Sequence, residues 1–148
     1  MKKRVLFLCT GNSARSQMAE ALFGLIAGDH FEASSAGTHP AGLNPVTVEA
    51  MQDVGVDVRQ YRSKHVNECM RQPFDYVITV CDRAKETCPV FPGARNIRNW
   101  SFDDPAVAPP DTRWAVFRRV RDEIADRICR FLIEECQLAP ASIRCYRC

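Results

Sequence analysis

The sequence predicts an α/β fold, a three-layer arrangement in which a small, mainly four-stranded parallel sheet carries helices on both faces. Short apolar runs that indicate buried strands alternate with longer segments whose apolar residues recur at helical spacing. The chain has 148 residues, enough for one domain that buries about two-thirds of the surface of its unfolded state.

The first half of the chain predicts two strand–helix units. Residues 4–8 predict a fully buried strand, and residues 17–26 predict a helix with one apolar face. A second strand over 31–36 precedes a second helix, in which Asn44 is the expected N-cap, Pro45 the expected first-turn residue and Gly55 the expected end.

The second half predicts two further strands and a long final helix. Residues 62–72 indicate a short irregular helical segment, and residues 74–80 are the clearest strand of the chain. A weaker strand is expected over 94–99, and apolar residues at helical spacing predict a helix over 112–136. In such sheets ligands bind at the carboxyl ends of the strands.

Charge and hydropathy limit the partners of the chain. The formal charge is +2 with acids and bases interspersed, which argues against a nucleic-acid partner. The apolar run from Val5 stops at Thr10, so we expect no export signal and no membrane span. We expect a monomer with one domain over 1–139 and a flexible tail over 140–148 that contains cysteines.

The chain contains eight cysteines, and without an export signal they indicate a reducing cytoplasm. Redox or metal chemistry is then favoured over a disulfide framework. The terminal pair Cys145 and Cys148 has the C-x-x-C spacing of metal-binding or exchanging thiols, but no second ligand pair is visible. We expect this tail to be functionally silent.

The segment between the first strand and the first helix predicts an oxyanion site. A thiol at the end of a buried strand, a turn of small residues and an arginine at a helix start together form a cradle of N–H groups and positive charge. The same field favours the thiolate, which is the nucleophilic form. The alternative is a buried structural cysteine. The residues of this predicted loop are Cys9, Thr10, Gly11, Asn12, Ser13, Ala14, Arg15 and Ser16.

Two more thiols and an acid are expected at the same edge of the sheet. Cys81 follows the strand over 74–80 and Cys88 follows seven residues later, so the three thiols could exchange disulfides in sequence. Two unrelated cysteines are the alternative. Asp104, before a proline, could protonate a leaving oxygen, although an ordinary turn acid or the neighbouring Asp103 would also fit.

At this point several motifs resemble one family, the thioredoxin-coupled arsenate reductases, which share the fold and loop of the low-molecular-weight protein tyrosine phosphatases. The resemblance runs from about residue 3 to residue 133 and implies a flavodoxin-like fold. The motifs are residues 9–20, Ser34-Ser35-Ala36-Gly37, the Cys81/Cys88 pair, Asp103-Asp104-Pro105-Ala106 and residues 117–124.

The resemblance implies a triple-cysteine reduction of arsenate. Cys9 attacks arsenate while Asp104 helps to expel water or hydroxide, and Cys81 then releases arsenite by forming a disulfide with Cys9. Cys88 attacks Cys81, and thioredoxin reduces the resulting Cys81–Cys88 bond. Ser16 would hydrogen-bond the thiolate, and Asn12 would hold the shape of the loop.

The chain also departs from the family pattern. Many relatives have a second loop cysteine where Ala14 stands here. Some bind potassium near Asn12, Glu20 and Ser35, where the ammonium of Lys64 could take the place of the ion in this chain. We therefore expect no metal site, and no cofactor is expected.

Two other functions compete with this interpretation. A phosphomonoesterase could use the same loop, since phosphate, sulfate and arsenate are similar tetrahedral oxyanions, but hydrolysis has no use for Cys81 and Cys88. A non-enzymatic arsenite-binding protein could use clustered thiols, but it leaves Arg15 unexplained. The sequence does not decide between thioredoxin, glutaredoxin and another thiol system as the reductant.

Overall fold

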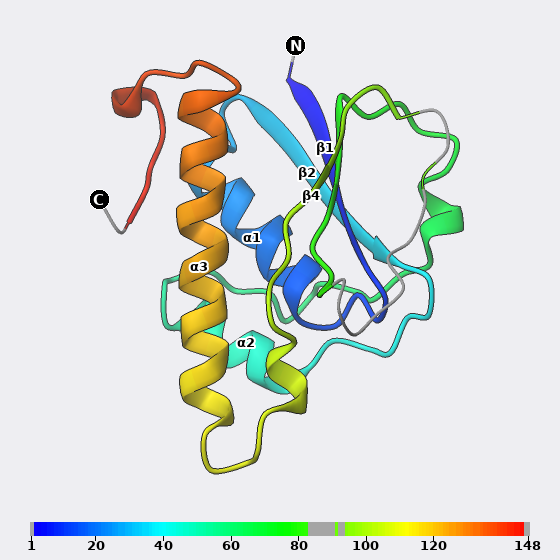
Figure 1. Cartoon of the computed structure of the whole chain (residues 1–148), viewed down its shortest axis with the longest axis vertical. Helices are drawn as coiled ribbons and strands as arrows, with labels where there is room; N and C mark the ends of the chain where they lie inside the picture. The colour runs from blue at the N-terminus through cyan, green and yellow to red at the C-terminus, as the bar shows by residue number, and fades with distance from the viewer. Residues whose placement is uncertain (1, 83–90, 92–93, 147–148) are drawn as a thin grey trace.

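The structure is a computed structural model that describes residues 2–82, 91 and 94–146. Its centre is a four-stranded parallel sheet in the order β2-β1-β3-β4 (Figure 1). The strands are β1 (Lys3–Cys9), β2 (Phe31–Gly37), β3 (Tyr76–Thr79) and β4 (Ile97–Asn99). Because β1 lies between β2 and β3, its carboxyl end is flanked by the ends of both neighbours.

Three α-helices pack on one side of this sheet, as Figure 1 shows. They are α1 (Arg15–Ala27), α2 (Pro45–Gln52) and α3 (Arg113–Glu134). The short 3-10 turns are η1 (Val66–Glu68), η2 (Pro105–Val107) and η3 (Pro140–Ser142). The α/β class predicted from the sequence is confirmed, but the prediction of helices on both faces is not: among the described residues, the opposite face carries the short turn η1 and no α-helix.

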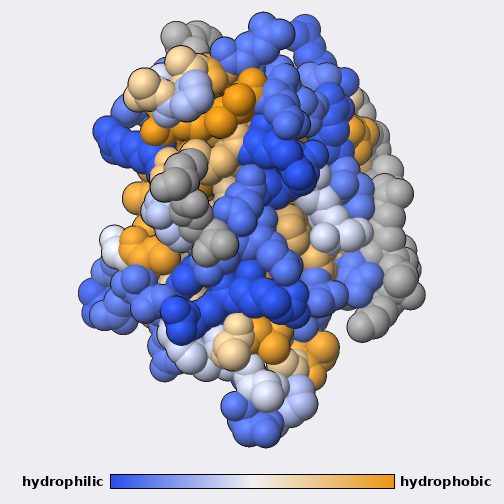
Figure 2. All heavy atoms as spheres, turned by 60° about the vertical axis from the view of Figure 1, so that its left-hand side comes forward, coloured by the Kyte–Doolittle hydropathy of each residue, from blue (hydrophilic) through white to orange (hydrophobic). Residues whose placement is uncertain are grey.

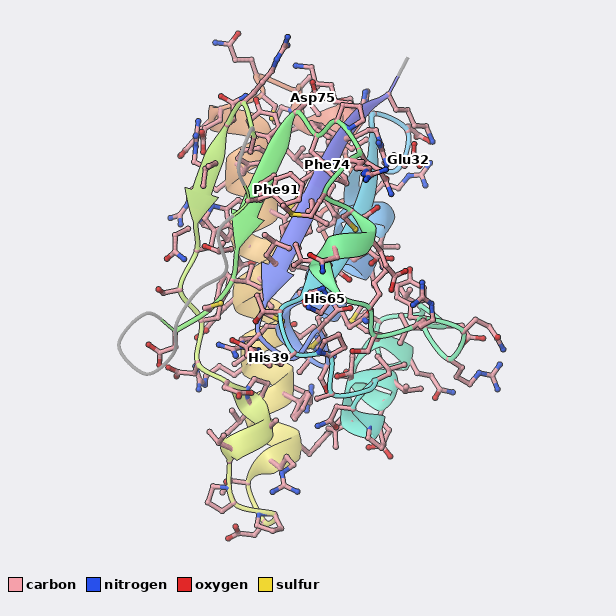
Figure 3. All side chains as sticks on the ribbon, turned by 90° about the vertical axis from the view of Figure 1, so that its right-hand side faces the viewer. Glu32, His39, His65, Phe74, Asp75 and Phe91 are labelled. Carbon is pink, nitrogen blue, oxygen red and sulfur yellow. A yellow bond between two sulfur atoms is a disulfide. The ribbon has the colours of Figure 1, made fainter. Side chains whose placement is uncertain are left out.

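The central strand β1 is buried on both faces because its alternate side chains enter two different cores. Val5 and Phe7 pack with α1 and α3, whereas Leu6 and Leu8 pack on the opposite face. That second core also contains Phe74 and Phe91, whose rings meet edge to face at 6.0 Å between centroids (Figure 3). This explains why the sequence of β1 is a continuous apolar run.

Several elements are shorter than the sequence predicts. The α2 helix ends at Gln52 and not at Gly55, whose positive φ of 83° belongs to the following turn. Strand β3 begins at Tyr76, because Asp75 instead exchanges hydrogen bonds with the main chain of Arg4. Strand β4 covers only Ile97–Asn99. These shifts leave the order of the elements unchanged.

The C-terminal segment contains a disulfide, whereas the sequence analysis favours redox or metal chemistry of the cysteines over disulfides. Cys129 of α3 and Cys145 of the tail form a disulfide with a Cα–Cα distance of 6.2 Å. The sequence could not predict this pair, because the separation of 16 residues between the two cysteines does not reveal that the chain turns back along α3. The predicted flexibility of residues 140–148 stays a prediction.

Within the described residues, none of the helices combines the length and the apolar character needed to cross a membrane.

Candidate active site

The predicted oxyanion loop connects the end of β1 with the start of α1. Cys9 is the last residue of β1, Arg15 is the first residue of α1, and the N-cap position of the helix is Ala14. An alanine offers no side-chain acceptor, so it does not compete for the N–H groups of the first helical turn. These N–H groups and the helix dipole therefore favour an anion beside Cys9.

The Cys9 thiol is 3% exposed and accepts hydrogen bonds from its own loop. The Asn12 backbone N–H donates to Sγ at 3.2 Å, and the Ser16 hydroxyl lies 2.8 Å from the same sulfur. The side-chain amide of Asn12 donates to the Ser16 oxygen at 2.8 Å, which leaves the Ser16 hydrogen to point at Cys9. Two donors directed at the sulfur stabilise a thiolate.

Asn12 fixes the loop in a conformation that few residues adopt. Its φ of 46° lies in the left-handed region, where asparagine is better tolerated than most residues. Its side chain is fully buried, and its amide oxygen accepts from the Lys64 backbone N–H at 2.9 Å and from Gln17 at 3.1 Å. Gln17 also donates to the Arg62 carbonyl at 3.2 Å.

A chain of polar groups extends from Asn12 to an acid. Asn12 donates to the Ser35 hydroxyl at 2.9 Å, and Ser35 donates to Glu20 at 2.7 Å. Burial raises the pKa of Glu20, while the Ser35 hydrogen bond and the charge of Lys64 act in the opposite direction. The Lys64 ammonium lies 4.0 Å from the Glu20 carboxylate.

Arg15 lies between the loop and the segment after β4. Its guanidinium is almost fully buried, donates to the Phe102 carbonyl at 3.2 Å and lies 3.7 Å from the Asp104 carboxylate. The second Asp104 oxygen accepts from the Ala106 N–H at 3.0 Å, which fixes the carboxylate at the start of η2. Asp103 instead pairs with Arg119 at 3.1 Å. The geometry thus favours Asp104 as the acid near the loop.

Cys81 follows the strand next to Cys9. The Val80 N–H donates to the Leu8 carbonyl at 2.9 Å, so the main chains at 80 and 8 are adjacent. Cys81 is fully buried and belongs to the same apolar core as Cys9. Cys88, the other predicted relay thiol, lies outside the described residues.

A pocket of about 360 Å³ opens beside the acid. Asp82, Asp104 and Arg119 are part of its wall, together with Val107 and Val116. The residue after Cys81 and the predicted acid therefore face one space.

The three histidines lie outside this network. His39 and His65 lie at the edge of the sheet where β1 ends (Figure 3), but their rings bond to Thr38 and to the Asn67 N–H. His30 contacts the Ser142 carbonyl at 3.2 Å. In the part of the chain that the structure describes, no group of three or more His, Cys, Asp or Glu side chains could hold a metal ion.

Sequence reasoning missed two supports of the loop. Gln17 lies directly after the loop, so its position in the sequence is a weak indication that it supports the loop. The Phe102 carbonyl that holds Arg15 is 87 residues away in the chain and gave none. Gly37, beside Cys9 in the sheet, is a further constraint, because a Cβ there would lie 2.5 Å from the Thr10 carbonyl oxygen.

A buried thiol in a loop between a parallel strand and a helix N-terminus is typical of proteins that bind tetrahedral oxyanions beside a nucleophilic thiol. Residues 4–140 match the family of low molecular weight phosphotyrosine protein phosphatases, and the chain belongs to this family. The family predicted from the sequence motifs is thereby confirmed.

The relatives of the chain within this family include arsenate reductases. An arsenate reductase of Halalkalibacterium halodurans is 45% identical over 132 residues, which cover 88% of this chain and 95% of that protein. A solved arsenate reductase in the phosphate binding state has a TM-score of 0.76 at 26% identity, over 89% of this chain and 98% of that chain. A thioredoxin-dependent arsenate reductase of Corynebacterium glutamicum has a TM-score of 0.68 at 30% identity, over 92% and 62% of the two chains.

Proposed function

We propose that this chain reduces arsenate to arsenite with its own thiols and is regenerated by thioredoxin. The observation that carries the proposal is the position of two buried thiols at the ends of adjacent strands, Cys9 in the oxyanion loop and Cys81 after β3. Hydrolysis needs one such thiol, whereas a two-electron reduction needs two. The arsenate reductases among the relatives support the same choice.

The first step joins Cys9 to arsenic. The thiolate attacks arsenate, and one arsenate oxygen leaves as water after receiving a proton that Asp104 is placed to donate. Arg15 supplies a planar pair of N–H donors for two of the remaining oxygens. The 3.7 Å separation between the Arg15 guanidinium and the Asp104 carboxyl group supports this assignment, because it places Asp104 beside the cation that would bind the substrate.

The second step transfers the electrons. Cys81 attacks the sulfur of Cys9, the sulfur–arsenic bond breaks, and its electron pair stays on arsenic, so that As(V) becomes As(III) and two thiols become the Cys9–Cys81 disulfide. Cys88 then attacks Cys81 and frees Cys9. The Cys81–Cys88 disulfide is reduced by the dithiol of thioredoxin, as the name of the Corynebacterium relative suggests.

A second candidate function is hydrolysis of phosphomonoesters through a Cys9 phosphoryl intermediate. The family match and the shared oxyanion loop favour some activity of this kind. An arsenite-binding protein without turnover is the weaker alternative, because binding of a soft ion has no need of the buried Arg15. We further propose that the chain acts as a monomer in the cytoplasm, where thioredoxin keeps thiols reduced.

Arsenate-dependent oxidation of NADPH in the presence of thioredoxin and its reductase tests the proposal. The wild type should turn over, and Cys9→Ser should be inactive toward both arsenate and an aryl phosphate, because a serine hydroxyl stays protonated in this loop. A parallel glutaredoxin–glutathione reaction identifies the reductant. Hydrolysis of the aryl phosphate without any reduction of arsenate would instead establish the phosphatase.

A further inference from the structure

The chain continues past its last α-helix and turns back along it. Gln137, with a φ of 57°, reverses the direction after α3, and the turn η3 leads into the tail, which lies beside α3 (Figure 1). The family match ends at residue 140, where this segment begins. The tail is therefore a feature of this chain outside the matched family region, and its contacts require their own explanation.

The tail contacts the end of α1. The Arg144 N–H donates to the Ile26 carbonyl at 2.9 Å. Ile26 is in the last turn of α1, where carbonyls lack a donor within the helix, so the tail supplies one. Next to this bond, Ile143 is 8% exposed and belongs to the main apolar core.

A second set of contacts joins the tail to a buried cation of α3. The Tyr146 hydroxyl donates to Asp122 at 3.0 Å, and Asp122 pairs with Arg121 at 2.9 Å. Arg121 is 3% exposed and also binds Asp53 and the Ala50 carbonyl of α2. The end of the tail thus closes a polar network that connects α3 with α2.

The disulfide lies between these two sets of contacts. Cys145 stands between Arg144 and Tyr146, and its partner Cys129 is in the second half of α3. Figure 2 shows the side of the molecule on which α3 and the tail lie, where hydrophobic residues form patches among hydrophilic ones. The remaining polar contacts are weak, since the Arg144–Asp29 pair at 3.4 Å is largely exposed. The disulfide adds a covalent bond to these noncovalent contacts of the tail.

We propose that Cys129 and Cys145 are a second thiol–disulfide couple, distinct from Cys9 and Cys81, which fastens the tail to α1 and α3 when oxidised and releases it when reduced. Oxidation takes two electrons and two protons from the thiols. A low-molecular-weight disulfide accepts them in two successive exchanges and leaves as two thiols. Reduction by a dithiol reverses the reaction, and the flexible tail expected from the sequence is then the reduced form.

This couple is remote from the candidate active site. Val116 and Arg119, near the start of α3, share the pocket of Asp104, whereas Cys129 lies 10 residues after Arg119, about 15 Å along the helix. Electrons of the arsenate relay therefore need not pass through it. Its redox state can follow the thiol–disulfide balance of the surroundings while the relay works.

Alkylation and peptide mapping of the full chain test whether the couple forms. The protein is equilibrated in mixtures of oxidised and reduced glutathione, acid-quenched and alkylated. We expect a Cys129–Cys145 peptide in oxidising mixtures and both peptides alkylated in reducing ones. Alkylation of both thiols in every mixture, or a bridge between other partners, would overturn the proposal.

Amide exchange and thermal unfolding test whether the bond holds the tail. Cys145→Ser should speed exchange at Arg144 at least about tenfold and lower the Tm by about 5–10 °C relative to the oxidised wild type. Wild type with the bond reduced should behave in the same way. Cys136→Ser is the matched control, because burial raises the pKa of this nearby thiol and it has no disulfide; its tail should stay protected.

Equal protection of Arg144 in Cys145→Ser and in the oxidised wild type would refute the fastening role. The alkylation, amide-exchange and unfolding measurements do not use arsenate, so the proposed function and the couple succeed or fail separately. Turnover of arsenate by Cys145→Ser is expected to equal that of the wild type.

Discussion

At the scale of single residues, the Asn12 backbone N–H and the Ser16 hydroxyl contact the Cys9 sulfur. Ser16 is both an acceptor from Asn12 and a donor to the sulfur, so its hydrogen is directed by a neighbour and does not rotate freely. A hydrogen bond to a charged acceptor contributes about 1.5–3 kcal/mol. We therefore expect Ser16 to contribute to the reactivity of Cys9.

Ser16→Ala should slow alkylation of Cys9 by iodoacetamide at pH 7 about tenfold or more, because the sulfur loses one of the two donors that the described residues direct at it. Rates are read from the Cys9 peptide by mass spectrometry. Cys69→Ala is the control: this buried thiol lies in the other apolar core, so the Cys9 rate should not change. An unchanged rate in Ser16→Ala would show that the hydroxyl does not serve the sulfur.

Arg15→Lys should lower kcat/KM for arsenate by about 100-fold or more, since an ammonium cannot reproduce the two parallel N–H donors of a guanidinium. Steady-state rates in the thioredoxin-coupled assay measure the loss. Arg59→Lys offers a matched control, because Arg59 is exposed and pairs only locally with Asp57 in the described structure. Similar losses in both variants would remove the special role of Arg15.

Glu20 is predicted to make the stability of the folded protein depend on pH. Because burial raises its pKa above the usual 4.5, the folded state binds the Glu20 proton more tightly than the unfolded state does. The stabilisation from the protonated Glu20 is fully present at pH values below the pKa of Glu20 in the unfolded chain. It is lost as the pH rises through the pKa of Glu20 in the folded protein.

Glu20→Gln keeps an oxygen acceptor for Ser35 and cannot ionise. Relative to this variant, the wild type should lose free energy of unfolding as the pH rises from about 4 toward neutrality. Urea unfolding at several pH values measures the difference. Parallel curves for the two proteins would contradict the raised pKa.

At the scale of elements, the contact between β2 and the loop after β1 leaves no room for a side chain. A Cβ at Gly37 would lie 2.5 Å from the Thr10 carbonyl oxygen and 2.9 Å from the Asn12 nitrogen, both of which are backbone atoms of the loop. The carboxyl end of β2 therefore limits where the loop after β1 can lie.

Gly37→Ala should destabilise the protein by about 1–3 kcal/mol and reduce turnover, because the loop must move away. Gly24→Ala is the control on α1, where a new Cβ meets nothing within 4 Å and should stabilise the helix by about 0.5–1 kcal/mol. Denaturant unfolding measures both. A neutral Gly37→Ala would mean that the loop adapts freely.

The order of elements could be predicted from the sequence because apolar periodicity and caps are local signals. The Asn44–Pro45 cap is one case: Asn44 accepts from the Val46 N–H as expected. The ends of β3 and β4 could not be predicted, because they depend on pairings between distant segments such as Arg4 with Asp75. The same reason explains why the Phe102 carbonyl and the Cys129–Cys145 bond were not predicted.

At the scale of the whole molecule, one sheet edge gathers residues that are far apart in the sequence. Cys9, Arg15 and Asp104 come together because β1 and the segment after β4 end on the same side. The loop itself could be predicted from its own residues and its resemblance to a family. The network of Gln17 and Lys64 around Asn12 depends on the folded chain.

The most direct test of the three-thiol reduction is a single-turnover experiment with Cys88→Ser. Without the third thiol, the variant should release about one arsenite per enzyme and stop as a Cys9–Cys81 disulfide, which peptide mapping detects. Cys81→Ser should release none, yet both variants should still hydrolyse an aryl phosphate if the wild type does. Continued turnover of Cys88→Ser with thioredoxin, or release of arsenite by Cys81→Ser, would contradict the mechanism.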